Sequence, residues 1–123
     1  MHFDATSLEP LYAQIATQFT AGILSGAFPE GSQVPSTTEV ARTYALNPAT
    51  VLRGMNELVA AGLLEKRRGI GMFVVAGAQA QARAQRQAAF FTERLTAMVA
   101  AAKALGITQA ELTAAIEKEY RHE

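Results

Sequence analysis

The amino-acid sequence predicts a mainly α-helical protein that contains one small β-hairpin. Apolar residues recur at helical spacing through most of the 123 residues. Helix-start signals stand at Ser36 and at Asn47, with only a short turn between the two helices they begin. Between residues 63 and 75 the apolar period changes to two, as in strands. We predict two parts, residues 1–76 with these features and residues 77–123 as an α-helical hairpin.

The first predicted helix begins after Pro10 and ends at Gly26. Its apolar positions follow helical spacing, at Leu11, Ile15, Phe19, Ile23 and Leu24. We expect this helix to pack behind the two that follow it. Residues 1–9 carry no strong pattern and are expected to be a loose lead-in.

The next two helices have clear start signals. Ser36 and Glu39 form a capping box, in which each side chain satisfies a free backbone N–H group, so a helix begins at Thr37. Asn47 followed by Pro48 is a second N-cap with proline at the first helical position. The three residues 44–46 between them have the length of the turn in a helix-turn-helix.

The second of these helices has two distinct faces. An apolar stripe, expected to be buried, consists of Val51, Leu52, Met55, Leu58 and Val59, and Gly62 is placed to end the helix. Three residues share an exposed face near its N-terminus, namely Ala49, Thr50 and Arg53.

Two short strands follow this helix. They are predicted at residues 63–65 and 72–75, around the turn Lys66-Arg67-Arg68-Gly69-Ile70-Gly71. A hairpin directly after the second helix of a helix-turn-helix is a wing. Residues 69 and 71 also form a Gly-x-Gly pattern, but no third glycine or following helix supports a nucleotide-binding loop.

Several ordered blocks resemble the winged-helix domain of GntR-type transcription regulators. The blocks are Pro10–Ile15, Val34–Ser36, Asn47–Val51, Glu57-Leu58, Gly62-Leu63 and Arg67–Val74. The Asn-Pro helix start and the short tail are more similar to the YtrA-type branch. The resemblance implies a repressor that binds an inverted-repeat operator in double-stranded DNA as a homodimer. It also implies a short strand at Gln33-Val34 beside the wing.

The resemblance and the helix positions together predict the DNA-binding residues. They are Ser36, Thr37, Thr38, Arg42, Asn47, Ala49, Thr50, Arg53, Lys66, Arg67, Arg68, Gly69, Ile70 and Gly71. Thr38 stands where the resembling proteins usually carry arginine, so operator preference is in doubt, although Arg42 lies on the same helical face. Tyr12 and Gln14 are candidates for phosphate contacts from the N-terminal end of the first helix, and for Tyr12 the favoured alternative is a partly buried residue that supports the fold.

The overall charge does not favour nucleic acid, because the formal net charge is zero. Through residue 78 the chain has five basic residues (Arg42, Arg53, Lys66, Arg67, Arg68) against six acidic ones (Asp4, Glu9, Glu30, Glu39, Glu57, Glu65). Three of the five are adjacent at the wing, where local potential decides phosphate binding. The alternative is a winged-helix protein-interaction module without DNA binding.

Beyond Val75 the composition changes. Residues 76–89 are rich in Ala, Gln and Arg and are expected to form exposed first turns of a long helix. A heptad-like seam then follows to Leu105, Gly106 ends the helix, and a capping box at Thr108 and Glu111 starts another. The predicted dimerisation residues are Phe90, Phe91, Leu95, Met98, Val99, Leu105, Leu112, Ile116 and Tyr120. The same aromatic and methionine side chains leave a small-molecule effector pocket as the alternative.

Other classes of protein find little support in the sequence. The chain has no cysteine, and its two histidines, His2 and His122, lie at opposite ends, so no metal or cofactor is expected. An enzyme using Asp4, Glu30 or Glu39 would lack a paired nucleophile or cofactor motif. No apolar run approaches the ~20 residues of a membrane span, and a cytoplasmic location is expected.

Overall fold

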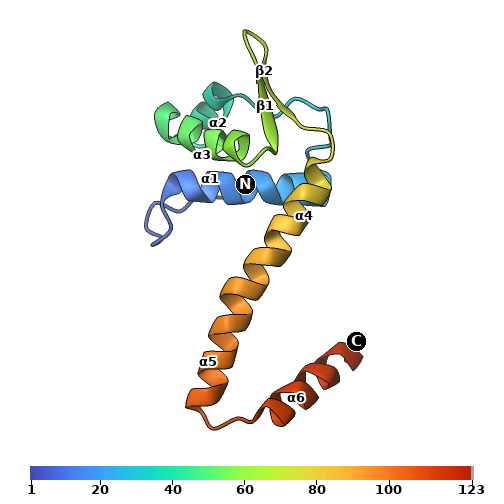
Figure 1. The fold of residues 1–123 in the computed structure, drawn as a ribbon. Helices are drawn as coiled ribbons and strands as arrows, with labels where there is room; N and C mark the ends of the chain where they lie inside the picture. The colour runs from blue at the N-terminus through green and yellow to red at the C-terminus, as the bar shows by residue number, and fades with distance from the viewer. Residues whose placement is uncertain (123) are drawn as a thin grey trace. The chain divides into compact units, whose positions relative to one another are not determined.

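The computed structural model describes residues 1–122 and divides the chain into two units. The first unit is Met1–Ala84 and the second begins at Gln85. The first unit contains α1 (Leu11–Ser25), α2 (Thr37–Thr43), α3 (Pro48–Ala60), β1 (Leu64–Arg67), β2 (Gly71–Val74) and the start of α4 (Ala78–Ala89). The mainly helical fold with a small hairpin is therefore confirmed (Figure 1).

The predicted ends of α2 and α3 are confirmed by their hydrogen bonds. The Ser36 side chain accepts from the Glu39 backbone N–H at 3.1 Å, and the capping box is complete. The Asn47 side chain accepts from the Ala49 backbone N–H at 2.8 Å. At the other end of α3, Gly62 adopts φ 78°, a left-handed conformation that suits glycine. The Gly62 N–H donates to Val59 and the Leu63 N–H to Leu58, which is the Schellman pattern.

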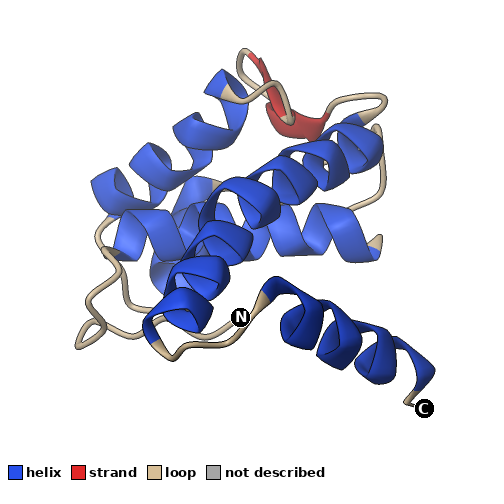
Figure 2. Ribbon diagram, turned by 60° about the horizontal axis from the view of Figure 1, so that its bottom comes forward, coloured by secondary structure: helices blue, strands red, loops and turns tan. Residues whose placement is uncertain are grey.

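The core of the first unit lies between α1 and α3, which pack closely. Figure 2 shows how much of the chain is helical and how small the hairpin is. A Cβ atom added at Gly54 would lie 2.6 Å from the Tyr12 carbonyl oxygen and 2.8 Å from the Ile15 Cβ. Glycine at this position therefore allows the two helices to approach. The buried apolar side chains here include Ile15, Phe19, Ile23, Val34, Val40, Val51, Met55, Leu58, Leu63, Leu64 and Val74.

The two strands of the hairpin follow the predicted pattern, and a segment before α2 also contacts them. β1 and β2 pair antiparallel, with Leu64 opposite Val74 and Arg67 opposite Gly71. Gln33 forms an isolated bridge with Phe73 beside the wing, in place of the short strand expected at Gln33-Val34. The base of the wing is thus held to the segment that precedes α2.

Residues 1–9 are not the loose lead-in that we expected. The Gln14 side chain is buried, and its amide nitrogen donates to the carbonyl oxygens of Asp4 and Glu9, each at 2.8 Å. Its side-chain oxygen accepts from the Asp4 N–H at 2.8 Å. Gln14 therefore holds the lead-in against α1, and both N–H donors of its amide are engaged there, which leaves neither for the predicted phosphate contact.

The first turns of α4 are not fully exposed either. Ala78 and Ala82 are completely buried in the core of the first unit. The side-chain amides of Gln79 and Gln81 donate to the carbonyl oxygens of Leu24 and Ala61, at 2.9 and 2.8 Å. The first compact unit consequently includes these turns and extends to Ala84.

The second unit contains the rest of α4, a π-helix η1 (Phe90–Leu95), α5 (Thr96–Ala104) and α6 (Gln109–Arg121). The π-helix corrects the predicted heptad seam, because its i→i+5 bonding interrupts the α-helical period between Phe91 and Leu95. Thr92 contributes to this irregularity, since its hydroxyl donates to the carbonyl oxygens of Ala88 and Ala89 at 3.1 and 3.3 Å. The helix end at Gly106 and the capping box at Thr108 are confirmed.

Much of the apolar surface of the second unit is open to solvent. Among its described residues only Ala102 is buried, whereas Leu95, Val99 and Leu112 are half-buried. The exposed large side chains are Phe90, Phe91, Met98, Leu105, Ile107, Ile116 and Tyr120. None of the helices within residues 1–122 has the length and apolar character needed to cross a membrane.

Candidate nucleic-acid interface

The solvent face of α3 includes one residue that we assigned to the buried stripe. Ala49, Leu52, Arg53 and Asn56 line one shallow surface groove with the spacing i, i+3, i+4 and i+7. Leu52 is 40% exposed, so its predicted burial is wrong. Counting three residues on from Ala49 would have placed Leu52 on this face. Thr50 is half-buried at the edge of the same helix.

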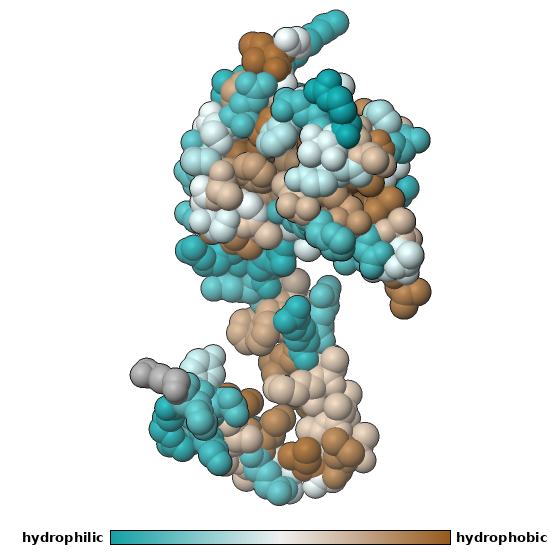
Figure 3. All heavy atoms as spheres, turned by 180° about the vertical axis from the view of Figure 1, so that it is seen from behind, coloured by the Kyte–Doolittle hydropathy of each residue, from teal (hydrophilic) through white to brown (hydrophobic). Residues whose placement is uncertain are grey.

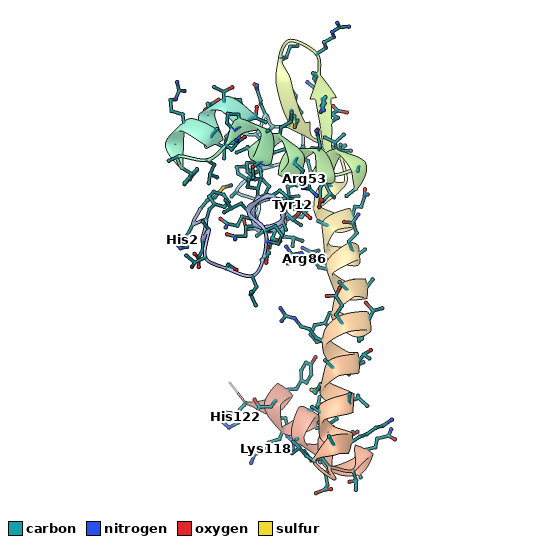
Figure 4. The ribbon with its side chains drawn as sticks, turned by 90° about the vertical axis from the view of Figure 1, so that its left-hand side faces the viewer. His2, Tyr12, Arg53, Arg86, Lys118 and His122 are labelled. Carbon is teal, nitrogen blue, oxygen red and sulfur yellow. The ribbon has the colours of Figure 1, made fainter. Side chains whose placement is uncertain are left out.

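Arg53 is held in place by a residue of α1. Its guanidinium lies over the ring of Tyr12, 3.7 Å from the ring centroid (Figure 4). Tyr12 is half-buried, as expected for a residue that supports the fold. A stacked guanidinium loses little freedom when it binds, because its orientation is already restricted.

The beginning of α2 and the wing border a second groove, of about 580 Å³. Its walls include Ser36, the N-cap of α2, with Thr37 and Thr38 from α2, Leu52 and Met55 from α3, and residues 66–72 from the hairpin. Thr38 and Arg42 are exposed on α2, whereas Ser36 and Thr37 are half-buried. Three of the predicted DNA-binding residues at the start of α2, namely Ser36, Thr37 and Thr38, therefore lie on one surface with those of the wing.

The three basic residues of the wing have different surroundings. Arg67 forms an ion pair with Glu65 at 3.0 Å, and its guanidinium lies 3.9 Å from the centroid of the Phe73 ring. Within the described part of the chain, Lys66 and Arg68 have neither an ion-pair nor an aromatic partner. Lys66 and Arg68 are thus the cations of the wing that remain available to a phosphate.

The tip of the wing is fixed by a side chain that we did not predict to act there. The Gln33 amide nitrogen donates to the Ile70 carbonyl oxygen at 2.9 Å. A Cβ atom added at Gly71 would lie 2.5 Å from that nitrogen, so Gly71 leaves the space through which Gln33 reaches the tip. No local sequence signal marks Gln33, because the contact joins residues 37 positions apart.

The titratable groups do not form a reactive cluster at this surface. Hydrogen bonds from the Thr6 side chain and backbone hold the pKa of Asp4 below its usual range, in the lead-in. The Glu39 carboxylate takes part in the capping box of α2. Within residues 1–122, no three His, Asp or Glu side chains gather in a way that could hold a metal ion.

A helix-turn-helix followed by a hairpin, with an exposed second helix and free cations on the hairpin, defines a winged helix-turn-helix protein. The model of the gntR family of bacterial regulatory proteins matches residues 11–74. The chain belongs to this family, and the predicted resemblance is confirmed.

Relatives differ in how much of their length the chain covers. The regulator YhcF of Bacillus subtilis is 31% identical over 111 residues, which is 90% of each chain. The transcriptional repressor YtrA of the same organism is 34% identical over 74 residues, 60% of this chain and 57% of YtrA. A transcriptional repressor of Salmonella typhimurium is 38% identical over 60% of this chain, but the chain spans only 31% of that repressor.

Solved structures of the family agree with the fold. A putative GntR-family regulator from Bacteroides thetaiotaomicron has a TM-score of 0.76 at 29% identity, over 89% of this chain and 96% of its own. The DNA-binding domain of AraR, solved in complex with the operator ORX1, has a TM-score of 0.55 at 25% identity. That likeness covers 61% of this chain and 93% of the AraR domain.

Proposed function

We propose that this protein is a sequence-specific DNA-binding transcription repressor that binds an inverted-repeat operator as a homodimer in the cytoplasm. One observation carries the proposal. The start of α2, Leu52 of α3 and the cationic wing border one groove, and Leu52 also lines the neighbouring groove along α3 that includes Ala49 and Arg53. The operator complex of the similar AraR domain supports a DNA partner for this surface.

In the proposed complex α3 enters the major groove. Arg53, already oriented by Tyr12, reads a guanine through its two parallel N–H donors. Ala49 and Leu52 present apolar atoms that suit a thymine methyl group, and Thr50 adds a hydroxyl. The N-terminal N–H groups of α3 lie close to a phosphate.

The backbone contacts come from few charges. Arg42 and Thr38 on α2 approach one strand, and Lys66 and Arg68 place the wing along the neighbouring minor groove. Arg67 contributes less, because Glu65 and Phe73 already engage it. So sparse a set of phosphate contacts gives weak binding for a single copy.

A homodimer compensates for these few contacts and covers the second unit. Phe91 is 60% exposed and Leu105 is 76% exposed in the single chain. Apolar side chains of this size are stabilised when a partner removes them from water. We assign them to the contact between two copies and not to an effector pocket.

The experiment that tests the function is selection from random duplex DNA by the full chain, followed by footprinting. We expect enrichment of a two-fold symmetric sequence whose half-sites lie about 10 base pairs apart or a multiple of that. The protein is a protein-interaction module instead if it enriches no DNA sequence and if its binding to DNA does not weaken as the salt concentration rises.

A further inference from the structure

The tip of the wing carries a large apolar side chain that the fold itself does not use. Ile70 is 63% exposed, and it does not belong to the core cluster or to the partly buried residues that pack on it. Figure 3 shows hydrophobic atoms at the free end of the hairpin, next to hydrophilic ones. An exposed isoleucine on an otherwise cationic turn contributes nothing to folding through burial.

The side chain is nevertheless presented in a defined position. The Ile70 N–H donates to the Arg67 carbonyl oxygen at 2.9 Å, and the Ile70 carbonyl oxygen accepts from Gln33 at 2.9 Å. Both backbone polar groups of this residue are therefore satisfied. Isoleucine is branched at Cβ, so its first side-chain torsion is also restricted. Gly69 beside it has no side chain, and a Cβ added there would meet nothing within 4 Å.

We propose that Ile70 makes the wing selective for A·T base pairs by excluding the guanine amino group from the floor of the minor groove. The inference rests on the proposed function, in which the wing lies in this groove. There A·T pairs present only acceptors, whereas G·C adds the N2 amino donor of guanine. An aliphatic side chain cannot accept a hydrogen bond, so an amino group covered by Ile70 would lose its water without replacement.

Arg68 offers a competing cause of the same preference. A-tracts have a narrow minor groove whose negative potential attracts arginine, and this attraction depends on groove shape and charge. The two causes depend on different properties of the DNA. Shape selection by Arg68 responds to groove width, whereas exclusion by Ile70 responds to the amino group itself.

Base analogues test the amino group, and comparison of the Ile70 and Arg68 variants on these analogues separates the two causes. Replacing guanine by inosine removes only the N2 amino group, and replacing adenine by 2,6-diaminopurine adds one, with the major-groove edge retained in each case. We would measure the affinity of the full chain for its selected operator carrying A·T, G·C, inosine·C or diaminopurine·T at the wing contact. The variants are Ile70→Ala and Ile70→Asn, with Arg68→Ala as the matched control.

For the unsubstituted protein we expect the two pairs with a minor-groove amino group to bind about tenfold more weakly than the two without it. Ile70→Ala should reduce the ratio of the dissociation constants, with and without the amino group, to near one, because water can then reach the amino group. Ile70→Asn should reverse it, since the asparagine oxygen can accept from guanine N2. Arg68→Ala should weaken all four operators together and leave the ratio unchanged.

The inference is overturned if inosine·C binds as weakly as G·C, or if Ile70→Ala leaves the amino-group ratio unchanged. If this ratio falls to near one in Arg68→Ala but not in Ile70→Ala, the preference for A·T pairs is due to groove shape. If the unsubstituted protein selects no operator at all, the proposed function fails, which is distinct from operator binding without amino-group discrimination.

Discussion

At the scale of single residues, Arg67 and Arg68 are adjacent in the sequence but are expected to contribute differently to DNA binding. Arg67 is engaged by Glu65 and Phe73, whereas Arg68 has no such partner among the described residues. Arg68→Ala should therefore lower the salt dependence of operator binding by about 0.9 in the slope of log K against log salt, the value for one phosphate. Arg67→Ala should change the slope by much less.

Salt titrations of both variants by fluorescence anisotropy measure this difference. Equal slope changes would mean that the Arg67 ion pair opens on binding and that Arg67 contacts DNA as well. An unchanged slope in Arg68→Ala would remove Arg68 from the phosphate contacts.

Arg53 and Tyr12 form a second pair whose roles can be separated. Arg53→Ala should weaken the selected operator by ~1–3 kcal/mol and scrambled DNA by less, because a base contact is lost. Tyr12→Leu should cost only about 0.5–1 kcal/mol, since it removes the stacking that orients the guanidinium. Tyr12→Phe keeps the ring and serves as the control.

A double-mutant cycle tests the dependence of one residue on the other. If Tyr12 acts through Arg53, replacing Tyr12 in the Arg53→Ala protein should cause no additional loss. A full additional loss would show that Tyr12 contacts DNA on its own.

At the scale of the elements, the approach of α1 to α3 depends on Gly54. Gly54→Ala should destabilise the first unit by about 1–2 kcal/mol, because overpacking against the Tyr12 carbonyl and Ile15 exceeds the gain in helix propensity. Urea unfolding of the full chain measures this change. The pair Glu57→Ala and Glu57→Gly, at an exposed interior position of the same helix, reports the propensity effect alone. A stabilised Gly54→Ala protein would show that the helices can separate without cost.

The capping box of α6 gives a pH dependence of known sign. Hydrogen bonds from the Thr108 backbone and side chain lower the pKa of Glu111. The charged form thus favours the folded helix start, and this contribution is present above the ordinary value of 4.5. It is lost as the pH falls below that value and through the lowered pKa.

We expect the Thr108 and Glu111 amide signals in NMR spectra to shift toward those of a frayed helix over this acidic range. Glu111→Gln keeps a hydrogen-bond acceptor but does not titrate, so its amide signals should not follow this transition. The same transition in both proteins would assign it to another group.

The elements also show what could be predicted from the sequence alone. The caps at Ser36, Asn47 and Thr108 were predictable because each bond joins residues at most three positions apart. The burial of Ala78 could not be predicted, since alanines in an Ala/Gln/Arg segment offer no hydrophobic contrast. The side-chain hydrogen bonds of Gln14 and Gln33 could not be predicted either, because no local pattern links Gln14 to Asp4 or Gln33 to Ile70.

The interface shows the same division between local and distant causes. The helical spacing from Ala49 placed Arg53 on the solvent face of α3, and the adjacent basic residues marked the wing. The stacking of Arg53 on Tyr12 and the engagement of Arg67 depend on packing between elements or across strands. The π-helix could not be predicted either, because the predicted heptad seam assumes the regular α-helical period, which the π-helix interrupts.

At the scale of the whole molecule, zero net charge and sparse cations make the number of copies decisive. Two copies double the phosphate contacts, and the second half-site then binds at a high effective concentration. Phe91→Glu places a charge on an exposed aromatic position of the proposed contact. Leu8→Glu is the matched control, because Leu8 is fully exposed in the lead-in of the first unit.

Light scattering after size exclusion should show a dimer at micromolar concentration for the unsubstituted chain and for Leu8→Glu, and a monomer for Phe91→Glu. The monomer should bind the full operator at least about a hundredfold more weakly, while its affinity for an isolated half-site stays unchanged. An unsubstituted chain that is monomeric and still binds the full operator tightly would contradict the dimer. In that case the few cations of one winged domain would suffice, and the exposed apolar residues of the second unit would need another partner.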